Sequence, residues 1–147
     1  MTKRLKVLVS AILVLCLFIV PLSPVSAATQ EGVMPRYNNV GTVTGGMSIN
    51  DSGKMTILYK YTGSESITTK AVITTYIEKK FLGLFWKRVD IGTTDNKWVD
   101  TINDYKYTGT RTYQLSSTGT YRVTVIYKIY GSGGSADEIE VQKTDSY

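Results

Sequence analysis

The side chains that most often carry out catalysis are almost missing from this chain. Among its 147 residues there is no histidine, and Cys16 is the only cysteine. Without imidazole a Ser–His–Asp triad cannot form, and a single thiol supports neither a disulfide nor a thiolate zinc site. The sequence also lacks a phosphate-binding glycine loop and a dinucleotide fingerprint. Most hydrolase, redox and zinc mechanisms are thereby excluded, so we expect a protein that is not an enzyme and uses no cofactor.

Carboxylates are the remaining side chains that could act in catalysis or bind a metal ion. One region of the sequence contains Asp90, Asp95, Asp100 and Asp104. Two acids can hydrolyse a glycosidic bond, and oxygen ligands suit calcium. The spacing matches no ordered calcium loop, and solvated acids on loops and strand edges explain the pattern better. We expect no metal site here, with a calcium site and a glycan hydrolase as weaker alternatives.

The segment 79–88, with the sequence KKFLGLFWKR, differs from the polar turns elsewhere in the chain. Gly83 at its centre predicts the tip of a hairpin. A three-residue loop over 82–84 sets Phe81 opposite Phe85, with Glu78 opposite Arg88 and Lys79 opposite Lys87. A two-residue loop would place Lys80 against Lys87, which is less favourable.

Three interpretations of this tip are open. The favoured one is structural: the tip folds over the end of a sandwich, with Phe81, Leu84 and Phe85 in the core and lysine stems lying across it. The alternatives are contact with a protein or glycan, and contact with a membrane, where apolar groups flanked by cations suit anionic lipid. The candidate contact residues are Phe81, Leu82, Leu84, Phe85, Trp86, Lys79, Lys80, Lys87, Arg88 and, in a separate loop, Trp98.

The N-terminus has the order of a secretory signal peptide. Three basic residues, Lys3, Arg4 and Lys6, precede an apolar run over 7–20, and small residues then lead to Ala27. We expect a leader helix over 1–27 that is cleaved between Ala27 and Ala28. A retained anchor is the alternative, but the run is shorter than the roughly 20 residues that span a bilayer. Lipid attachment at Cys16 is disfavoured because Leu15 precedes it.

Cleavage would change the character of the chain. Removing 27 of the 147 residues leaves 120, with no cysteine, and leaves 14 basic and 12 acidic residues, a net charge of +2. The overall charge of +5 is therefore mostly a targeting feature, and we expect no nucleic-acid partner. The protein is expected to be secreted to the extracellular space.

Beyond a flexible lead-in over 28–39, the pattern is β throughout. Threonine, tyrosine, valine and isoleucine dominate, and polar turn clusters recur at 50–53, 63–66, 116–119 and 131–135. Apolar residues alternate on three strand faces: Met55, Ile57, Tyr59 and Tyr61; Ala71, Ile73 and Ile77; and Tyr121, Val123, Val125, Tyr127 and Ile129. This period predicts a single antiparallel β-sandwich over 40–147, with seven to nine strands.

The segment Ser117 to Val123, STGTYRV, resembles the corner before strand F of immunoglobulin-like domains. The resemblance implies a structural corner at Gly119 and Tyr121, with the tyrosine hydroxyl bonded back to the loop. Val123 stands where antibody domains have a cysteine, so the resemblance does not imply a strict antibody relationship and leaves fibronectin-like and bacterial sandwiches open. With Trp86-Lys87-Arg88-Val89 and Gly119-Thr120-Tyr121-Arg122-Val123, the chain is also similar to uncharacterised families of small exported Gram-positive bacterial proteins.

These features lead to two functional hypotheses. The first is a non-catalytic binding or adhesion module for an extracellular protein, glycan or membrane surface, with contact through 81–86 and the Trp98 loop. The alternative is a membrane-active secreted protein, such as an antibacterial factor or toxin, that uses the same tip. The sequence specifies neither the ligand nor the oligomeric state.

Overall fold

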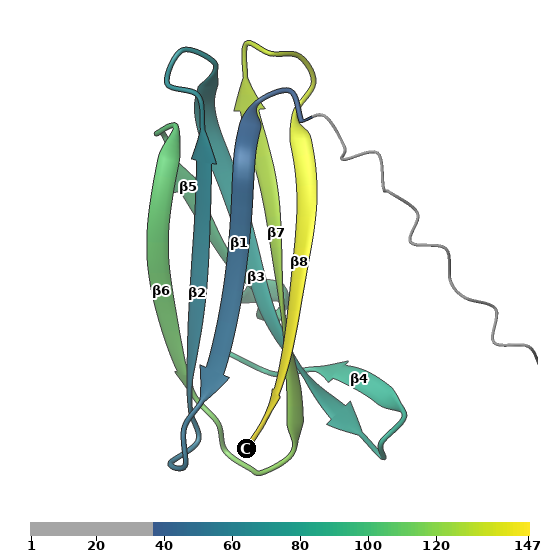
Figure 1. Ribbon diagram of the computed structural model, residues 1–147. Coiled ribbons are helices and arrows are strands. Elements are labelled where there is room, and N and C mark those ends of the chain that lie inside the picture. Colours follow the sequence, from purple (N-terminus) through teal and green to yellow (C-terminus); the bar gives the residue numbers. More distant parts are fainter. Residues whose placement is uncertain (1–36) are drawn as a thin grey trace, which may run out of the picture. The chain divides into compact units, whose positions relative to one another are not determined.

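The structure, a computed structural model, describes residues 37–147; the predicted leader and its cleavage site lie outside these residues. The described part is all-β and antiparallel (Figure 1). It contains eight strands and one short 3-10 turn: β1 (Val40–Ile49), β2 (Lys54–Gly63), β3 (Thr68–Phe81), β4 (Phe85–Arg88), η1 (Thr94–Asn96), β5 (Trp98–Ile102), β6 (Lys106–Gln114), β7 (Thr120–Gly131) and β8 (Asp137–Ser146). The predicted strand number is confirmed.

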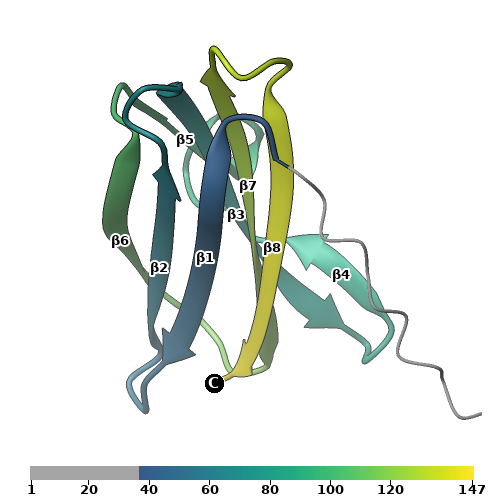
Figure 2. The ribbon, with the colours of Figure 1, turned by 45° about the horizontal axis from the view of Figure 1, so that its top comes forward.

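The strands form two sheets that pack face to face in a sandwich-like arrangement (Figure 2). One sheet has the order β1-β2-β6, and the other has the order β4-β3-β7-β8, with β5 also paired to β3. Because β7 occupies one edge of β3, both β4 and β5 must share the other edge. β5 pairs with residues 71–75 of β3 and β4 with residues 78–81. β3 is therefore the strand that links the body of the sandwich to the hairpin.

The core lies between the sheets and consists of the predicted alternating faces. All twelve predicted residues are buried: Met55, Ile57, Tyr59 and Tyr61 of β2; Ala71, Ile73 and Ile77 of β3; and Tyr121, Val123, Val125, Tyr127 and Ile129 of β7. β-Branched and aromatic side chains suit this pleated surface, and successive residues point to opposite faces. The period-two pattern therefore identified the buried side of each central strand.

β1 and β8 belong to different sheets and lie side by side along a seam (Figures 1 and 2). Side-chain carboxylates form hydrogen bonds across this seam. Asp137 accepts hydrogen bonds from the backbone N–H groups of Asn38 (2.8 Å), Asn39 (2.6 Å) and Val40 (3.0 Å). At the other end of the seam, Asp145 accepts one from Ile49 (2.9 Å). The predicted flexible lead-in therefore ends earlier than expected, because Asn38 and Asn39 are already bound to β8.

Tyr127 connects the sheets across the core. Its hydroxyl donates to the carbonyl of Thr44 on β1 (2.7 Å) and accepts from the backbone N–H of Lys60 on β2 (3.2 Å). Burial raises the pKa of Tyr127 to about 12, and burial likewise raises the pKa of Tyr61 to about 12. Both phenols are held in their neutral form well above the pH at which an exposed tyrosine ionises.

These raised pKa values predict a loss of stability in alkali. In the unfolded chain tyrosine ionises near pH 10, whereas in the fold Tyr127 keeps its proton until about pH 12. The unfolded state therefore binds fewer protons in this window, and the free energy of unfolding falls as pH rises from 10 to 12. By pH 11 each such tyrosine should lower the free energy of unfolding by about 1.4 kcal/mol. Urea unfolding at pH 8 and pH 11 should show a smaller loss for Tyr127→Phe than for the wild type; equal losses would contradict this assignment.

Candidate functional site

The candidate site arises where the end of β3 leaves the two packed sheets (Figures 1 and 2). β3 has 14 residues, whereas β1 and β2 have 10 each. Pairing between β3 and β7 ends at Lys79 opposite Tyr121, and within residues 37–147 the last part of β3 pairs with β4 alone. Figures 1 and 2 show this β3–β4 hairpin projecting away from the two sheets.

The hairpin has the predicted register. Phe81 pairs with Phe85 and Lys79 with Lys87 around a loop over 82–84, and the N–H of Leu84 donates to the carbonyl of Phe81 (3.1 Å). Two loop residues have left-handed backbones: Leu82 with φ of 51° and Gly83 with φ of 68°. Glycine adopts this conformation freely, but a leucine there costs roughly 1–2 kcal/mol. The turn therefore keeps a large apolar side chain at a position that is unfavourable for it.

The tip residues are exposed, and the predicted structural plug is wrong. The exposed fractions are 56% for Phe81, 74% for Leu82, 74% for Leu84 and 64% for Phe85. Phe81 continues the inward-facing series of β3, but the hairpin projects to the side of the sandwich, where none of the described strands of the opposing sheet covers it (Figures 1 and 2). The local pattern identified the hairpin, whereas the burial of its side chains depended on where the opposing sheet lies.

Cations surround the base of the tip and lie against aromatic rings. On the outer face Trp86 lies between Lys80, whose Nζ is 5.8 Å from the ring centroid, and Arg122, whose guanidinium is 4.4 Å away. Arg122 is fixed in turn by Glu78, with its Nη2 2.6 Å from Oε2 and its Nε 2.9 Å from the same oxygen. These contacts hold Trp86 between two cations at the base of the hairpin.

A second set of contacts joins the hairpin to the corner before β7. The Nζ of Lys79 donates to Oγ of Ser117 (2.7 Å) and lies 5.5 Å from the ring of Tyr121. The hydroxyl of Tyr121 donates to the carbonyl of Ser117 (2.6 Å), as the sequence predicted, and Gly119 has φ of 143°. On the other face of the hairpin, Arg88 lies 3.5 Å from the ring centroid of Tyr76. The base of the hairpin is therefore fixed on both faces.

An open hollow of about 540 Å³ runs beside the hairpin. Its lining consists of four cations, two apolar tip residues and the start of the following loop: Lys79, Lys80, Lys87, Arg88, Phe81, Leu82, Val89 and Asp90. Only one of these residues is acidic. The hollow and the tip together form a surface that is both apolar and positively charged, which we call the tip surface.

Trp98 does not belong to the tip surface. It lies on β5, faces inward, and makes an edge-on contact with Tyr113 at 6.1 Å between ring centroids. The guanidinium of Arg111 lies 5.0 Å from its ring. Trp98 therefore packs at the seam between β5 and β6 and is separated from the other predicted contact residues.

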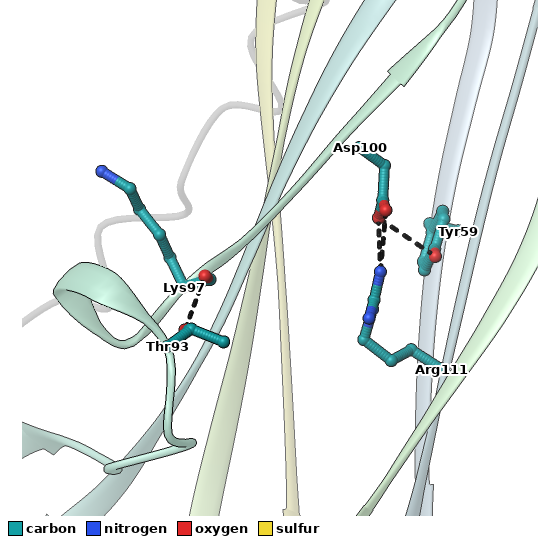
Figure 3. Close-up of polar contacts among 5 residues, drawn as sticks. All are labelled: Tyr59, Thr93, Lys97, Asp100 and Arg111. Atoms are coloured by element: carbon teal, nitrogen blue, oxygen red, sulfur yellow. Dashed lines mark hydrogen bonds and ion pairs between the residues drawn. The ribbon is translucent and has the colours of Figure 1, made fainter.

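The same seam holds an ion pair that the sequence did not reveal. Figure 3 shows Arg111 of β6 pointing at Asp100 of β5, and its Nη2 donates to both carboxylate oxygens at 2.8 Å. The hydroxyl of Tyr59 lies 3.4 Å from the same carboxylate. Burial, and then the charge of Asp100, raise the pKa of Tyr59. The sequence feature that could have revealed this ion pair is the position of Arg111 on the inward face of β6, between Gly109 and Tyr113.

The four aspartates of the suspected cluster are dispersed. Asp100 is bound to Arg111, Asp95 pairs with Lys97 at 3.0 Å, and Asp90 accepts the N–H of Gly92 at 2.9 Å. The loop that carries Asp95 is closed by a separate hydrogen bond from Thr93 to the carbonyl of Lys97 (2.8 Å, Figure 3). In the part of the chain that the structure describes, no three acidic side chains are close enough to hold a metal ion. This geometry favours the interpretation that these aspartates are ordinary acidic residues on loops and at the seam between the sheets.

No protein-family model matches this chain, and no curated protein is significantly similar to it. Over residues 37–147 the structure contains no helix of the length and apolar character needed to cross a membrane.

A pair of matched truncations tests whether the tip lies outside the core. Leu84→Ala should change the free energy of unfolding by less than about 0.5 kcal/mol, because its side chain is exposed. Ile77→Ala, four residues before Phe81 on the inward face of β3, should cost about 2–5 kcal/mol because it leaves a cavity. Urea unfolding measures both. Comparable losses in the two variants would show that the tip is part of the core.

Proposed function

We propose that this chain is an exported, non-catalytic binding module that contacts a cell-surface or extracellular partner through the tip surface. One observation carries the proposal: four large apolar side chains are exposed together on a single projecting turn. Isolated exposed apolar residues are common, but a contiguous exposed patch marks an interaction site. Folding does not explain the patch, because these side chains cover no core.

The chemistry of the turn supports the same conclusion. A hairpin of this length forms most easily with glycine, asparagine or aspartate at its left-handed positions. Here Leu82 occupies such a position at a conformational cost, and its side chain is 74% exposed. Unfavourable backbone conformations in native proteins concentrate at functional sites. A favourable free energy of binding by the exposed Leu82 side chain would offset this conformational cost.

The hairpin is also held rigid before any partner arrives. Lys79 is bound to the corner at Ser117, and Glu78 to Arg122 of β7. A contact surface that is already ordered loses less conformational entropy on binding. The tip is thus suited to recognition without rearrangement.

We propose further that the sandwich is of the immunoglobulin-like kind, in its fibronectin-like variant. In such domains the first, second and fifth main strands form one sheet, and the third, sixth and seventh form the other. The orders β1-β2-β6 and β3-β7-β8 follow this division, with β4 and β5 added at the edge of β3. The bond from Tyr121 to Ser117 at the start of β7 supports the same assignment.

Export is proposed from the sequence of the first 27 residues, which lie outside the described part of the chain. In this proposal the leader is removed and the protein acts as residues 28–147 outside the cell. Those residues include 37–147, which form a compact unit.

Binding to whole surfaces tests the proposed function. Fluorescently labelled residues 28–147 should be retained on at least one member of a panel of intact Gram-positive cells, erythrocytes and a glycan array. The Leu84→Asp variant should no longer be retained on that surface, because a charge at the tip opposes contact with any apolar partner. The matched control is Val99→Asp, which adds the same charge at a residue that is 53% exposed on β5, away from the tip. The proposal fails if no surface retains the wild type, or if Leu84→Asp binds as well as Val99→Asp.

A further inference from the structure

We infer that the partner of the tip surface is the anionic face of a lipid bilayer, into whose headgroup region the hairpin inserts. This inference rests on the proposed function and names its partner. Three observations on the hairpin carry it: the order of side chains along its length, the distribution of apolar groups around it, and its charge.

Side chains along the hairpin follow a fixed order from the tip to the base. Leu82 and Leu84 flank the turn, and the pair Phe81–Phe85 comes next. Behind them lies the pair Lys80–Trp86, and behind that the pair Lys79–Lys87. The sequence of layers is therefore aliphatic, aromatic, tryptophan with a cation, and finally two cations.

This order matches a membrane interface in both chemistry and depth. Tryptophan prefers the headgroup level, and lysine and arginine meet anionic lipid at the surface. At about 3.3 Å per residue for an extended strand, Gly83 projects at most about 10 Å beyond Lys80. Apolar groups of interfacial proteins enter about 5–10 Å into the headgroup and acyl boundary. Insertion up to the level of Trp86 would place each layer where it is most stable.

Apolar side chains lie on both faces of the hairpin and at its turn, because Trp86 pairs with Lys80 on the face opposite Phe81 and Phe85. Phe81 and Phe85 lie on the face that continues the core, while Leu82 and Leu84 lie at the turn itself, and all four are more than half exposed. A groove on a protein covers one face of a hairpin, whereas a lipid phase covers every side at once. The distribution therefore favours lipid over a protein groove.

Positive charge is also present on both faces of the hairpin. Lys79 and Lys87 lie on one face and Lys80 and Arg88 on the other, since neighbouring residues of a strand point to opposite faces. Across 79–89 there is no acidic residue, and Glu78 before this stretch is paired with Arg122. This charge complements an anionic lipid surface rather than a neutral one.

The reach of the hairpin limits what it does to the bilayer. A projection of at most about 10 Å covers only part of the roughly 30 Å hydrocarbon core. We therefore infer docking on one leaflet without opening of the membrane, which separates this inference from the hypothesis of a pore-forming toxin.

Vesicle co-sedimentation tests the inference with residues 28–147; the predicted leader is omitted because its apolar run would itself bind lipid. The protein should sediment with vesicles of phosphatidylcholine and phosphatidylglycerol, more weakly with phosphatidylcholine alone, and less at high salt. Leu84→Asp should reduce the affinity at least tenfold and Val99→Asp should leave it unchanged. Lys87→Gln should weaken binding about fivefold, as expected for one cation at an anionic surface. In a Trp98→Phe background, the emission of Trp86 should shift to the blue on binding.

The outcomes separate this inference from the proposed function. No sedimentation, or equal binding to neutral and anionic vesicles, overturns the inference. If Leu84 is nevertheless required for binding to cells or glycans, the binding function stands and its partner is not lipid. Release of trapped dye from the vesicles would also overturn docking on one leaflet. If Leu84→Asp affects neither vesicles nor cells, both proposals fail.

Discussion

The face of a β-sheet is buried only where an opposing sheet covers it, and this constraint governs the molecule. β3 runs through the centre of the larger sheet and then, past its pairing with β7, leaves the sandwich to the side as the hairpin (Figures 1 and 2). Within the sandwich its inward residues, such as Ile73 and Ile77, are fully buried. Past that boundary the same inward series reaches Phe81, which is mostly exposed. One strand therefore supplies both the core and the contact surface.

The body of the sandwich is fixed by polar contacts at its seams as well as by its apolar core. Asp137 and Asp145 bind the backbone along one seam, and Asp100 pairs with Arg111 along the other. Tyr127 bridges the sheets between them. None of these contacts involves the exposed tip residues 81–85. The tip can carry side chains that suit a partner without weakening the core, and the body presents it in a fixed position.

Local patterns in the sequence predicted the local structure. Alternation identified the buried faces of β2, β3 and β7, and cross-strand pairing of Phe81 with Phe85 identified the hairpin register. The features that were missed depend on residues far apart in the chain. Asn39 is anchored by Asp137, and the exposure of Phe85 depends on where the opposing sheet lies. Alternation along one strand carries no information about where the other sheet lies, so the plug was the natural but wrong expectation.

The central claim is that the tip lies outside the sandwich and meets solvent in the free protein. Paramagnetic relaxation by an inert gadolinium chelate, read on the methyl groups by NMR, measures this directly. The account predicts strong relaxation at Leu82 and Leu84 and almost none at Ile73 and Ile77, which are fully buried. Protection of both leucines to the level of the two isoleucines would contradict it, because the tip would then be part of the core.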